Sequence, residues 1–268
     1  MKPVRALVVV GLAMLLPGRA DAQESRTADS LVRPAPVVMR RDLLIIGAGA
    51  GLAFLAQKSD LRVRNEVRSA AWQDQGPLGT LASAGNAWGG SAALALGLGL
   101  WGGGVYTRHE NVAAVGVRGV EAIVVSGLVT KVLKAGFGRS RPRVTPTDAW
   151  DVEFGRGWDN DHESFPSGHS TAAFAFAAAV TSETARRAPD RAVLIGAGTF
   201  TLAGVTAFAR MYDDAHWLSD VTMGAAIGMA SGWAVTRWHA TRPGNRLDAL
   251  LLPGRDGRTL VGATISWR

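Results

Sequence analysis

Six long stretches of mostly small and apolar residues, with few charges, occur along this chain, and more polar segments separate them. Their apolar residues do not alternate with the period of two that a half-buried strand requires, and each stretch is long enough for a helix. The sequence therefore predicts an all-α fold, a helical bundle of about six helices. The expected helices cover residues 43–57, 86–106, 111–134, 170–186, 192–210 and 216–237.

The C-terminal tail, residues 243–268, departs from this pattern. Turn-forming residues separate two apolar runs there: Pro253, Gly254, Asp256 and Gly257. This arrangement is typical of a hairpin. We therefore expect a short β-hairpin or an edge strand after the helical domain, to which we assign residues 43–242.

The composition excludes several classes of protein. Hydrophobic residues make up 47% of the 268 residues and charged residues only 19%, which is too apolar for a disordered chain. Because the sequence has no cysteine, disulfide scaffolds, cysteine-based zinc sites, iron–sulfur clusters and thiol catalysis are excluded. The formal net charge is +7, but no block of Lys or Arg stands out, so no nucleic-acid partner is expected. This balance favours an anionic substrate or a membrane surface.

The first 22 residues have the three parts of a secretory signal peptide. Lys2 and Arg5 precede an apolar run over residues 6–16, and small residues follow at Ala20 and Ala22. We expect cleavage after Ala22 and export of the protein; the alternative is an N-terminal anchor helix that stays attached. The polar residues 23–42 then form a flexible lead-in.

Glycines in the first expected helix resemble a dinucleotide-binding fingerprint. Gly47, Gly49 and Gly51 occur close together, but the fingerprint needs its third glycine three residues after the second, and Leu52 stands there. No acidic residue on a second strand follows. We therefore interpret this segment as a helix of small residues that packs closely on its neighbours.

Three polar clusters carry residue types suited to chemistry. The first, KAGFGRSRP at residues 134–142, follows the end of an expected helix. The second, PSGH at residues 166–169, directly precedes a helix, and the third, RMYDDAHWLSD at residues 210–220, connects two helices. Each cluster therefore lies at a helix terminus.

These clusters predict a phosphate-binding site, because a phosphate dianion needs several donors in fixed positions. Arg141 and Arg210 each offer a planar fork that matches two phosphate oxygens, and Lys134 adds a point charge. Ser167 and Gly168 lie where a helix begins, so free backbone N–H groups and the positive end of the helix dipole face the anion.

The same clusters contain a candidate nucleophile and a candidate acid. His216 and Asp220 stand four residues apart on one expected helix, so the carboxylate can reach one ring nitrogen. That contact fixes the tautomer and leaves the other nitrogen free to attack phosphorus. His169 is then placed to protonate the leaving oxygen. We expect His109 and His239, which belong to no cluster, to be ordinary structural residues.

The pattern K-x6-RP, PSGH and R-x5-H-x3-D resembles the motifs of the type 2 phosphatidic acid phosphatase (PAP2) superfamily, which also holds class A acid phosphatases and vanadium haloperoxidases. The matching positions run from Lys134 to Asp220. The superfamily usually has Ser before the third-motif arginine, where this chain has Ala209, a departure that we expect to matter little. The resemblance implies a PAP2-like fold, with His216 as a nucleophile that forms a phosphohistidine, His169 as general acid and Asp220 orienting His216.

The resemblance further implies a phosphoric ester hydrolase that needs no metal or other cofactor, because the site's lysine and arginines supply the charge. We expect an exported phosphatase that hydrolyses a phosphomonoester or pyrophosphate, and we favour a lipid substrate because Gly/Ala/Leu-rich helices flank the site. The alternatives are a soluble periplasmic acid phosphatase with small substrates, a haloperoxidase that would bind vanadate, and a non-catalytic lipid- or phosphate-binding protein.

An acidic loop lies between the first and second clusters. Asp159, Asp161 and Glu163 suggest a calcium site, but an EF-hand loop requires Gly at its sixth position, where this chain has Ser164. We favour a solvated loop near the substrate entrance. Its aromatic residues could form an apolar rim there: Trp150, Phe154 and Trp158.

Several expected helices are long enough to cross a membrane, but they are weakly hydrophobic. Arg118 and Glu121, which can pair on one helix face, would be costly in lipid. If the chain starts outside and the five helices from residue 43 to residue 210 all cross, the 134–170 loop ends in the cytoplasm. We therefore expect that the 43–57 helix does not cross, or that none does. Either way, we place the active site on the outer side of the membrane or in the periplasm.

Overall fold

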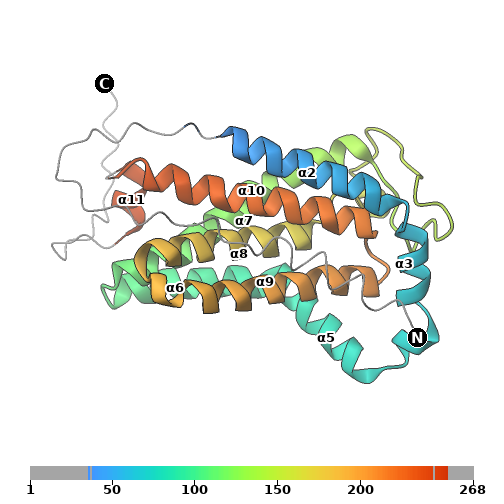
Figure 1. Ribbon diagram of the computed structural model, residues 1–268, viewed down its shortest axis with the longest axis horizontal. Helices are drawn as coiled ribbons and strands as arrows, with labels where there is room; N and C mark the ends of the chain where they lie inside the picture. The colour runs from blue at the N-terminus through green and yellow to red at the C-terminus, as the bar shows by residue number, and fades with distance from the viewer. Residues whose placement is uncertain (1–35, 37, 244, 253–268) are drawn as a thin grey trace. The chain divides into compact units, whose positions relative to one another are not determined.

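Four long helices form the centre of the fold, and consecutive helices in this set run in opposite directions (Figure 1). The computed structural model describes residues 36, 38–243 and 245–252, and this part of the chain contains helices but no β-strand. The all-α prediction is therefore confirmed. The four central helices are α7 (Glu110–Phe137), α8 (Gly168–Arg187), α9 (Pro189–Tyr212) and α10 (Leu218–Ala240).

Helix α8 lies between α7, α9 and α10 and is buried on most sides. Its alanines allow this, because a helix that is apolar all round can be surrounded by other helices. Glycines of α10 bring the two backbones close together. A Cβ atom on Gly228 would lie 2.4 Å from the carbonyl oxygen of Thr171, and one on Gly232 would lie 2.5 Å from that of Ala175.

Helix α2 (Arg40–Gln57) packs antiparallel on α10 (Figure 1). A Cβ atom on Gly49 would lie 2.1 Å from the Cβ atom of Ala226, so the close packing expected of this small-residue segment is confirmed. The helix begins at Arg40, so the last residues of the expected lead-in are already helical. The expected signal peptide lies outside the described residues.

The segment before α7 contains more helix than the sequence indicated. The helix expected over residues 86–106 is part of a longer rod: α5 (Gly76–Ala87), a π-helical turn (Trp88–Ala92) and α6 (Ala93–Tyr106). The short helices α3 (Asp60–Val67) and α4 (Ala70–Gln73) were not expected, so the estimate of about six helices was too low. Both are too short to show an apolar periodicity, and α3 is also mostly polar.

The beginning of the C-terminal tail is helical. Helix α11 (Arg246–Leu251) is held against the bundle by the Trp101 indole N–H, which donates to the carbonyl oxygen of Leu251 at 2.7 Å. Leu252 is buried beside Val117. The prediction of a hairpin or strand is therefore wrong for residues 246–251, and its remaining part, residues 253–268, lies outside the described residues.

By length and composition, the described helices α7 and α9 could each cross a membrane. Both reach a mean hydropathy of 1.8, but core helices of soluble proteins can do the same. Of the most apolar window, 44% is buried inside the bundle in α7 and 22% in α9. Helix α9 therefore presents most of this apolar surface to its surroundings.

A buried charge cluster fastens α11 to α7 and α10. Arg118 pairs with Glu121 at 3.0 Å, as expected, and also with Asp248 of α11. The two ring nitrogens of His239 lie 2.9 Å from a Glu121 oxygen and 3.0 Å from an Asp248 oxygen. Because carboxylates only accept hydrogen bonds, this geometry requires both ring nitrogens to be protonated. Burial alone would lower the pKa of His239, but the hydrogen bonds to Asp248 and Glu121 outweigh it, so the pKa is raised.

This cluster predicts a pH-dependent contribution to stability. Because the pKa of His239 is raised in the folded state, its contribution is complete below about pH 6.5 and is lost as the pH rises through the folded-state value. We expect His239→Gln to lower the free energy of unfolding by about 2 kcal/mol at pH 5.5 and by less at pH 9. Thermal unfolding followed by circular dichroism checks this. The exposed His109 supplies the control His109→Gln, and an equal loss at both pH values would contradict the prediction.

Candidate active site

The alternating directions of the central helices bring the three polar clusters to one end of the bundle. The carboxyl ends of α7 and α9 meet the amino ends of α8 and α10 there (Figure 1). Lys134 lies in the last turn of α7 and Arg210 in that of α9. Ser167 caps α8, accepting a hydrogen bond from the Ser170 N–H at 3.4 Å, and Asp220 lies in the first turn of α10. The Ser167 N–H itself donates to the carbonyl oxygen of Asp220 at 3.1 Å, so it is not the free backbone donor that the sequence predicted.

Three cations at this end are held by neutral oxygen atoms. Lys134 donates to the carbonyl oxygen of Glu163. Arg141 donates to the carbonyl oxygens of Asn160 and Ala215, at 2.6 and 3.3 Å. Arg210 donates to the side-chain oxygen of Asn86 at 2.6 Å.

None of these three cations forms an ion pair with a carboxylate of the described residues. Lys134 and Arg141 are nevertheless buried. Their positive charge is therefore available to an anionic ligand.

His169 lies close to all three cations. Burial and the positive charges of Arg210, Arg141 and Lys134 together lower the pKa of His169 to about 4. The π-helical turn also lies close to His169, since a Cβ atom on Gly90 would be 3.5 Å from the imidazole Nε2. The imidazole is therefore neutral at physiological pH while the site holds no anion.

His216 precedes α10, which begins at Leu218, so the expectation that His216 and Asp220 share one helix is wrong. The two side chains nevertheless lie near each other, because Asp220 is in the first turn of α10. Nδ1 of His216 lies 3.6 Å from an Asp220 carboxylate oxygen, too far for a hydrogen bond, and this buried nitrogen has no other partner among the described residues. Burial lowers the pKa of His216 to about 3, and Lys134 and Arg141 contribute, while Asp220 acts in the opposite direction. A neutral imidazole has a free electron pair, which is what a nucleophile requires.

Asp220 is fully buried and has more partners than the sequence indicated. Arg139 donates to one carboxylate oxygen at 2.6 Å, while the Ser164 hydroxyl, at 2.6 Å, and the Trp217 N–H, at 2.8 Å, donate to the other. Burial alone would raise the pKa of Asp220, but the positive charge of Arg139, the nearby His216 ring and the hydrogen bond from Ser164 hold it well below its usual range. Asp220 is therefore a permanent carboxylate behind His216.

Three residues of this site were missed by the sequence analysis. Arg139 lies inside the first cluster, and its positive charge there is the one sequence signal that could have identified it. Asn86 holds Arg210 from 124 positions away, and Asp60 holds Arg139 from 79 positions away. Neither belongs to a motif, so no local pattern could have found them.

Ala209, the residue before Arg210, points away from these groups. It is fully buried in an apolar cluster with Val67, Ala82 and Tyr212. A hydroxyl at this position would therefore enter the core of the bundle.

The carboxylates of the acidic loop point to different partners. Asp159 lies 3.1 Å from a ring nitrogen of His162, Asp161 pairs with Arg143 at 2.6 Å, and Glu163 pairs with Lys131 at 2.5 Å. Among the described residues, no group of three or more His, Asp or Glu side chains has the geometry of a metal site. The three carboxylates therefore do not form the shared oxygen cage that a calcium ion requires.

The aromatic side chains of this loop are open to the surroundings. Trp150 is 62% exposed, Phe154 81% and Trp158 72%. The ring of Phe154 packs against Phe137 at the end of α7, with 6.1 Å between the ring centres. An exposed aromatic surface therefore continues from α7 into the loop.

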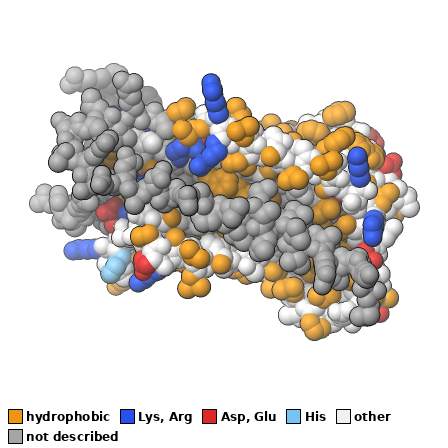
Figure 2. Space-filling model, viewed as in Figure 1, with side chains coloured by type: hydrophobic (Ala, Val, Ile, Leu, Met, Phe, Trp, Pro, Cys, Tyr) orange, Lys and Arg blue, Asp and Glu red, His pale blue; other side chains and the backbone are white. Residues whose placement is uncertain are grey.

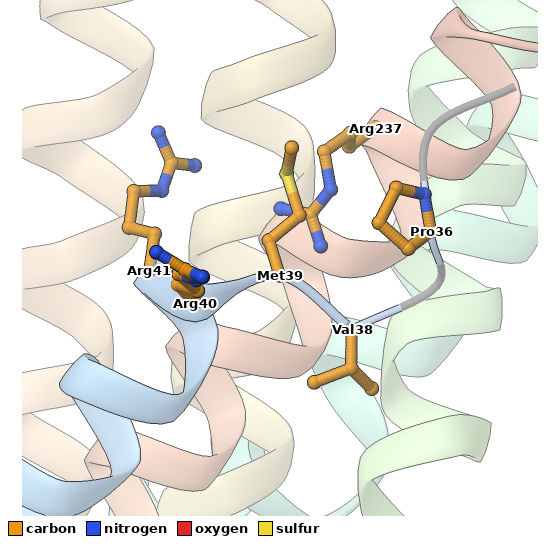
Figure 3. Close-up of a pocket in the computed structure, with 6 residues that line it drawn as sticks. All are labelled: Pro36, Val38, Met39, Arg40, Arg41 and Arg237. Atoms are coloured by element: carbon orange, nitrogen blue, oxygen red, sulfur yellow. The ribbon is translucent and has the colours of Figure 1, made fainter. Parts of the chain in front are cut away.

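A separate cavity lies at the other end of α2 and α10 (Figure 3). Its volume is about 700 Å³, and Arg40, Arg41 and Arg237 contribute side chains to it. Arg237 also pairs with Asp42 there. This cavity is built by helix ends that carry none of the three clusters.

Comparison with known proteins finds a family whose model resembles this part of the chain. Residues 117–243 match the model of the PAP2 superfamily. The chain is similar to a lipid A 1-phosphatase from Porphyromonas gingivalis, with 36% identity over 99 residues, which are 37% of this chain and 18% of that protein. The match therefore spans less than a fifth of the relative's length.

A solved structure shows the same fold. The crystal structure of a transmembrane PAP2-type phosphatidylglycerolphosphate phosphatase from Bacillus subtilis superposes with a TM-score of 0.55. The match has 18% sequence identity and covers 77% of this chain and 98% of that chain. The resemblance noted in the sequence is thus confirmed by the family match and at the level of the fold.

The pKa of His169 leads to a prediction about anion binding. A bound dianion would offset the three cations that lower this pKa, so His169 should gain a proton when the anion binds. We expect sulfate, which does not itself titrate near pH 6, to bind with uptake of about one proton. Titration calorimetry in two buffers of different ionisation enthalpy measures this number. His169→Gln should abolish the uptake and His109→Gln should not, whereas unchanged uptake in His169→Gln would contradict our interpretation.

Proposed function

Because residues 117–243 match the model of the PAP2 superfamily, we propose that this chain is a phosphatase that hydrolyses a phosphorylated lipid through a phosphohistidine at His216. The observation that carries the proposal is the set of three cations without carboxylate partners around two neutral histidines. This set suits a phosphate dianion, because the anion would supply the negative charge that the site lacks. A protein that only needed stability would not gather these charges without pairing them.

In the proposed mechanism, Arg141, Arg210 and Lys134 bind the phosphoryl oxygens. The free backbone N–H groups at the start of α8 add further donors. Nε2 of His216 attacks phosphorus, and His169, protonated once the dianion is bound, gives its proton to the leaving oxygen. These cations supply the charge stabilisation, so we propose that no metal is needed.

The second half of the reaction returns the enzyme to its starting state. Phosphorylation at Nε2 leaves a positively charged ring whose Nδ1–H faces the Asp220 carboxylate. His169, now neutral, takes a proton from water, which attacks phosphorus and breaks the bond to His216. Phosphate is released, and the proton remains on His169 or leaves with the product.

The surface of the bundle supports a lipid substrate. Large apolar side chains are exposed along α7, as they are on the face of the molecule seen in Figure 2. Val125, Leu128 and Val132 are among them, and the exposed aromatic residues of the loop continue this surface toward the site. An apolar surface that reaches a phosphate site can hold the acyl chains while the headgroup enters. Both named relatives are phosphatases of lipids by their descriptions.

We further propose that the active site faces the outer side of the membrane. The support is the signal-peptide pattern of residues 1–22, which directs the following chain to the secretory route. A site at the end of the bundle, beside apolar helices, could then reach headgroups in the outer leaflet.

The covalent mechanism predicts the behaviour of two variants. His216→Ala should lower turnover at least about 1,000-fold, because no other group replaces the nucleophile. His169→Ala should still form the phosphoenzyme from para-nitrophenyl phosphate, whose leaving group needs little protonation, and should accumulate it. Phosphate release and acid-quench trapping of the phosphoenzyme measure both effects.

His109→Ala, at an exposed histidine far from the site, is the matched control. Near-normal turnover of His216→Ala would contradict the assignment of the nucleophile. Activity that a chelator removes and zinc or magnesium restores would contradict the metal-free mechanism.

The lipid assignment predicts a selective effect of the loop aromatics. The triple variant Trp150→Ser, Phe154→Ser and Trp158→Ser should lower kcat/KM for phosphatidate in vesicles about tenfold, because less apolar surface contacts the lipid. Its rate on para-nitrophenyl phosphate should stay within about twofold, since these side chains lie outside the anion site.

Tyr106→Ser is the control, because Tyr106 is 89% exposed at the opposite end of the bundle. Equal losses on both substrates, or no loss on either, would favour a soluble phosphatase with small substrates.

A further inference from the structure

Asp60, the first residue of α3, is buried beneath the candidate site and is 1% exposed. One of its carboxylate oxygens accepts a hydrogen bond from the Ser219 N–H at 2.9 Å. The other accepts from the Ser219 hydroxyl at 2.6 Å and from Arg139 at 2.8 Å. These three donors belong to segments far from α3 in sequence, so Asp60 ties α3 to the start of α10 and to the first cluster.

Arg139 lies between two carboxylates, and its whole guanidinium group is engaged. Its Nη1 donates to the Ser219 hydroxyl at 2.7 Å and to Asp220 at 2.6 Å. Its Nη2 donates to Asp60 and to the carbonyl oxygen of Ala149, which also accepts from Nε at 3.1 Å. Because a guanidinium has five N–H groups in one plane, these contacts leave it a single orientation.

The orientation of Arg139 fixes that of Asp220. One oxygen of Asp220 accepts from Arg139, so the other is directed toward Ser164, the Trp217 N–H and Nδ1 of His216. If Asp60 could not hold Arg139, the guanidinium could turn and the carboxylate could rotate with it. The distance between Asp220 and His216 would then no longer be set.

Asp60 also determines the charge behind His216. Burial raises the pKa of Asp60, while the hydrogen bonds from Ser219 and the charge of Arg139 act in the opposite direction. With Asp60 ionised beside Arg139, the two carboxylates and the one guanidinium that they share carry a net charge of −1. Without the charge of Asp60, Arg139 would neutralise Asp220 alone. The ring of His216 becomes positive when it is phosphorylated, so the remaining negative charge stabilises the intermediate.

We propose that Asp60 is a positioning residue, which through Arg139 holds Asp220 against His216 and keeps the charge behind that histidine negative. This role rests on the proposed function. It extends the site beyond the three sequence clusters to a helix, α3, that carries none of the reacting groups.

The test is a double-mutant cycle with Asp60→Asn and Asp220→Asn, using phosphate release from para-nitrophenyl phosphate. We expect Asp60→Asn to lower kcat about 10- to 100-fold, with KM and sulfate affinity within about twofold of the unmutated protein. In the Asp220→Asn background it should have little further effect, because Asp60 acts through Asp220. If Asp60 had a purely structural role, Asp60→Asn would lower kcat by the same factor in both backgrounds.

Asp42→Asn is the matched control, since Asp42 is an equally buried aspartate that pairs with an arginine at the other end of α2. It should leave kcat unchanged. If Asp60→Asn does not fold, Ser219→Ala removes one hydroxyl from the same network and should show a smaller loss of kcat, again absent in the Asp220→Asn background.

The outcomes separate this role from the proposed function. A normal kcat for Asp60→Asn in an active protein, or effects of Asp60→Asn and Asp220→Asn that multiply, would overturn the role of Asp60 alone. If the unmutated protein releases no phosphate from any ester, the proposed function fails and the role of Asp60 fails with it.

Discussion

The arrangement of this site depends on three cations that the fold gathers without giving them carboxylate partners. Like charges close together in a buried place repel one another, and they remain only if local dipoles stabilise them. Backbone carbonyls and an asparagine do so here for Lys134, Arg141 and Arg210. Lys134 and Arg210 also lie in last helical turns, where the helix dipole favours positive charge. Without an anionic ligand, this arrangement has an excess of positive charge.

The charges behind His216 are arranged in the opposite way, because each of them is paired. Arg139 is fully paired, and every contact of Asp60 and Asp220 is to a donor. One side of the histidine therefore faces cations that lack carboxylate partners, while the other side is a fully paired network with little freedom to change. A nucleophile benefits from both, because its ring must be held still while the charge in front of it changes.

The sequence predicted the parts of this site that depend on local spacing. The contact between His216 and Asp220, the cap of α8 and the cations at helix ends each follow from a few neighbouring residues. Asp60 and Asn86 could not be found in this way, because their partners lie 79 and 124 positions away and are chosen by the packing of helices. The polar helix α3 was missed for the same reason: Asp60, Arg64 and Val67 hold it by contacts with residues outside the helix, and its own sequence shows no apolar periodicity.

The π-helical turn at Trp88–Ala92 has a consequence for how the substrate end can change. A Cβ atom on Gly89 would lie 2.3 Å from the Thr206 methyl carbon and 3.0 Å from the carbonyl oxygen of His169, so the rod of α5 and α6 is pinned to α8 and α9 at this point. A π turn holds one residue more than an α turn, and one residue in an α-helix corresponds to a rotation of about 100°. Removing one residue here would turn α5 by that angle relative to α6 and carry Asn86 off Arg210. The extra residue thus sets the rotation of α5 about its own axis relative to α6. Deleting that residue would therefore disturb the anion site without replacing any group in it.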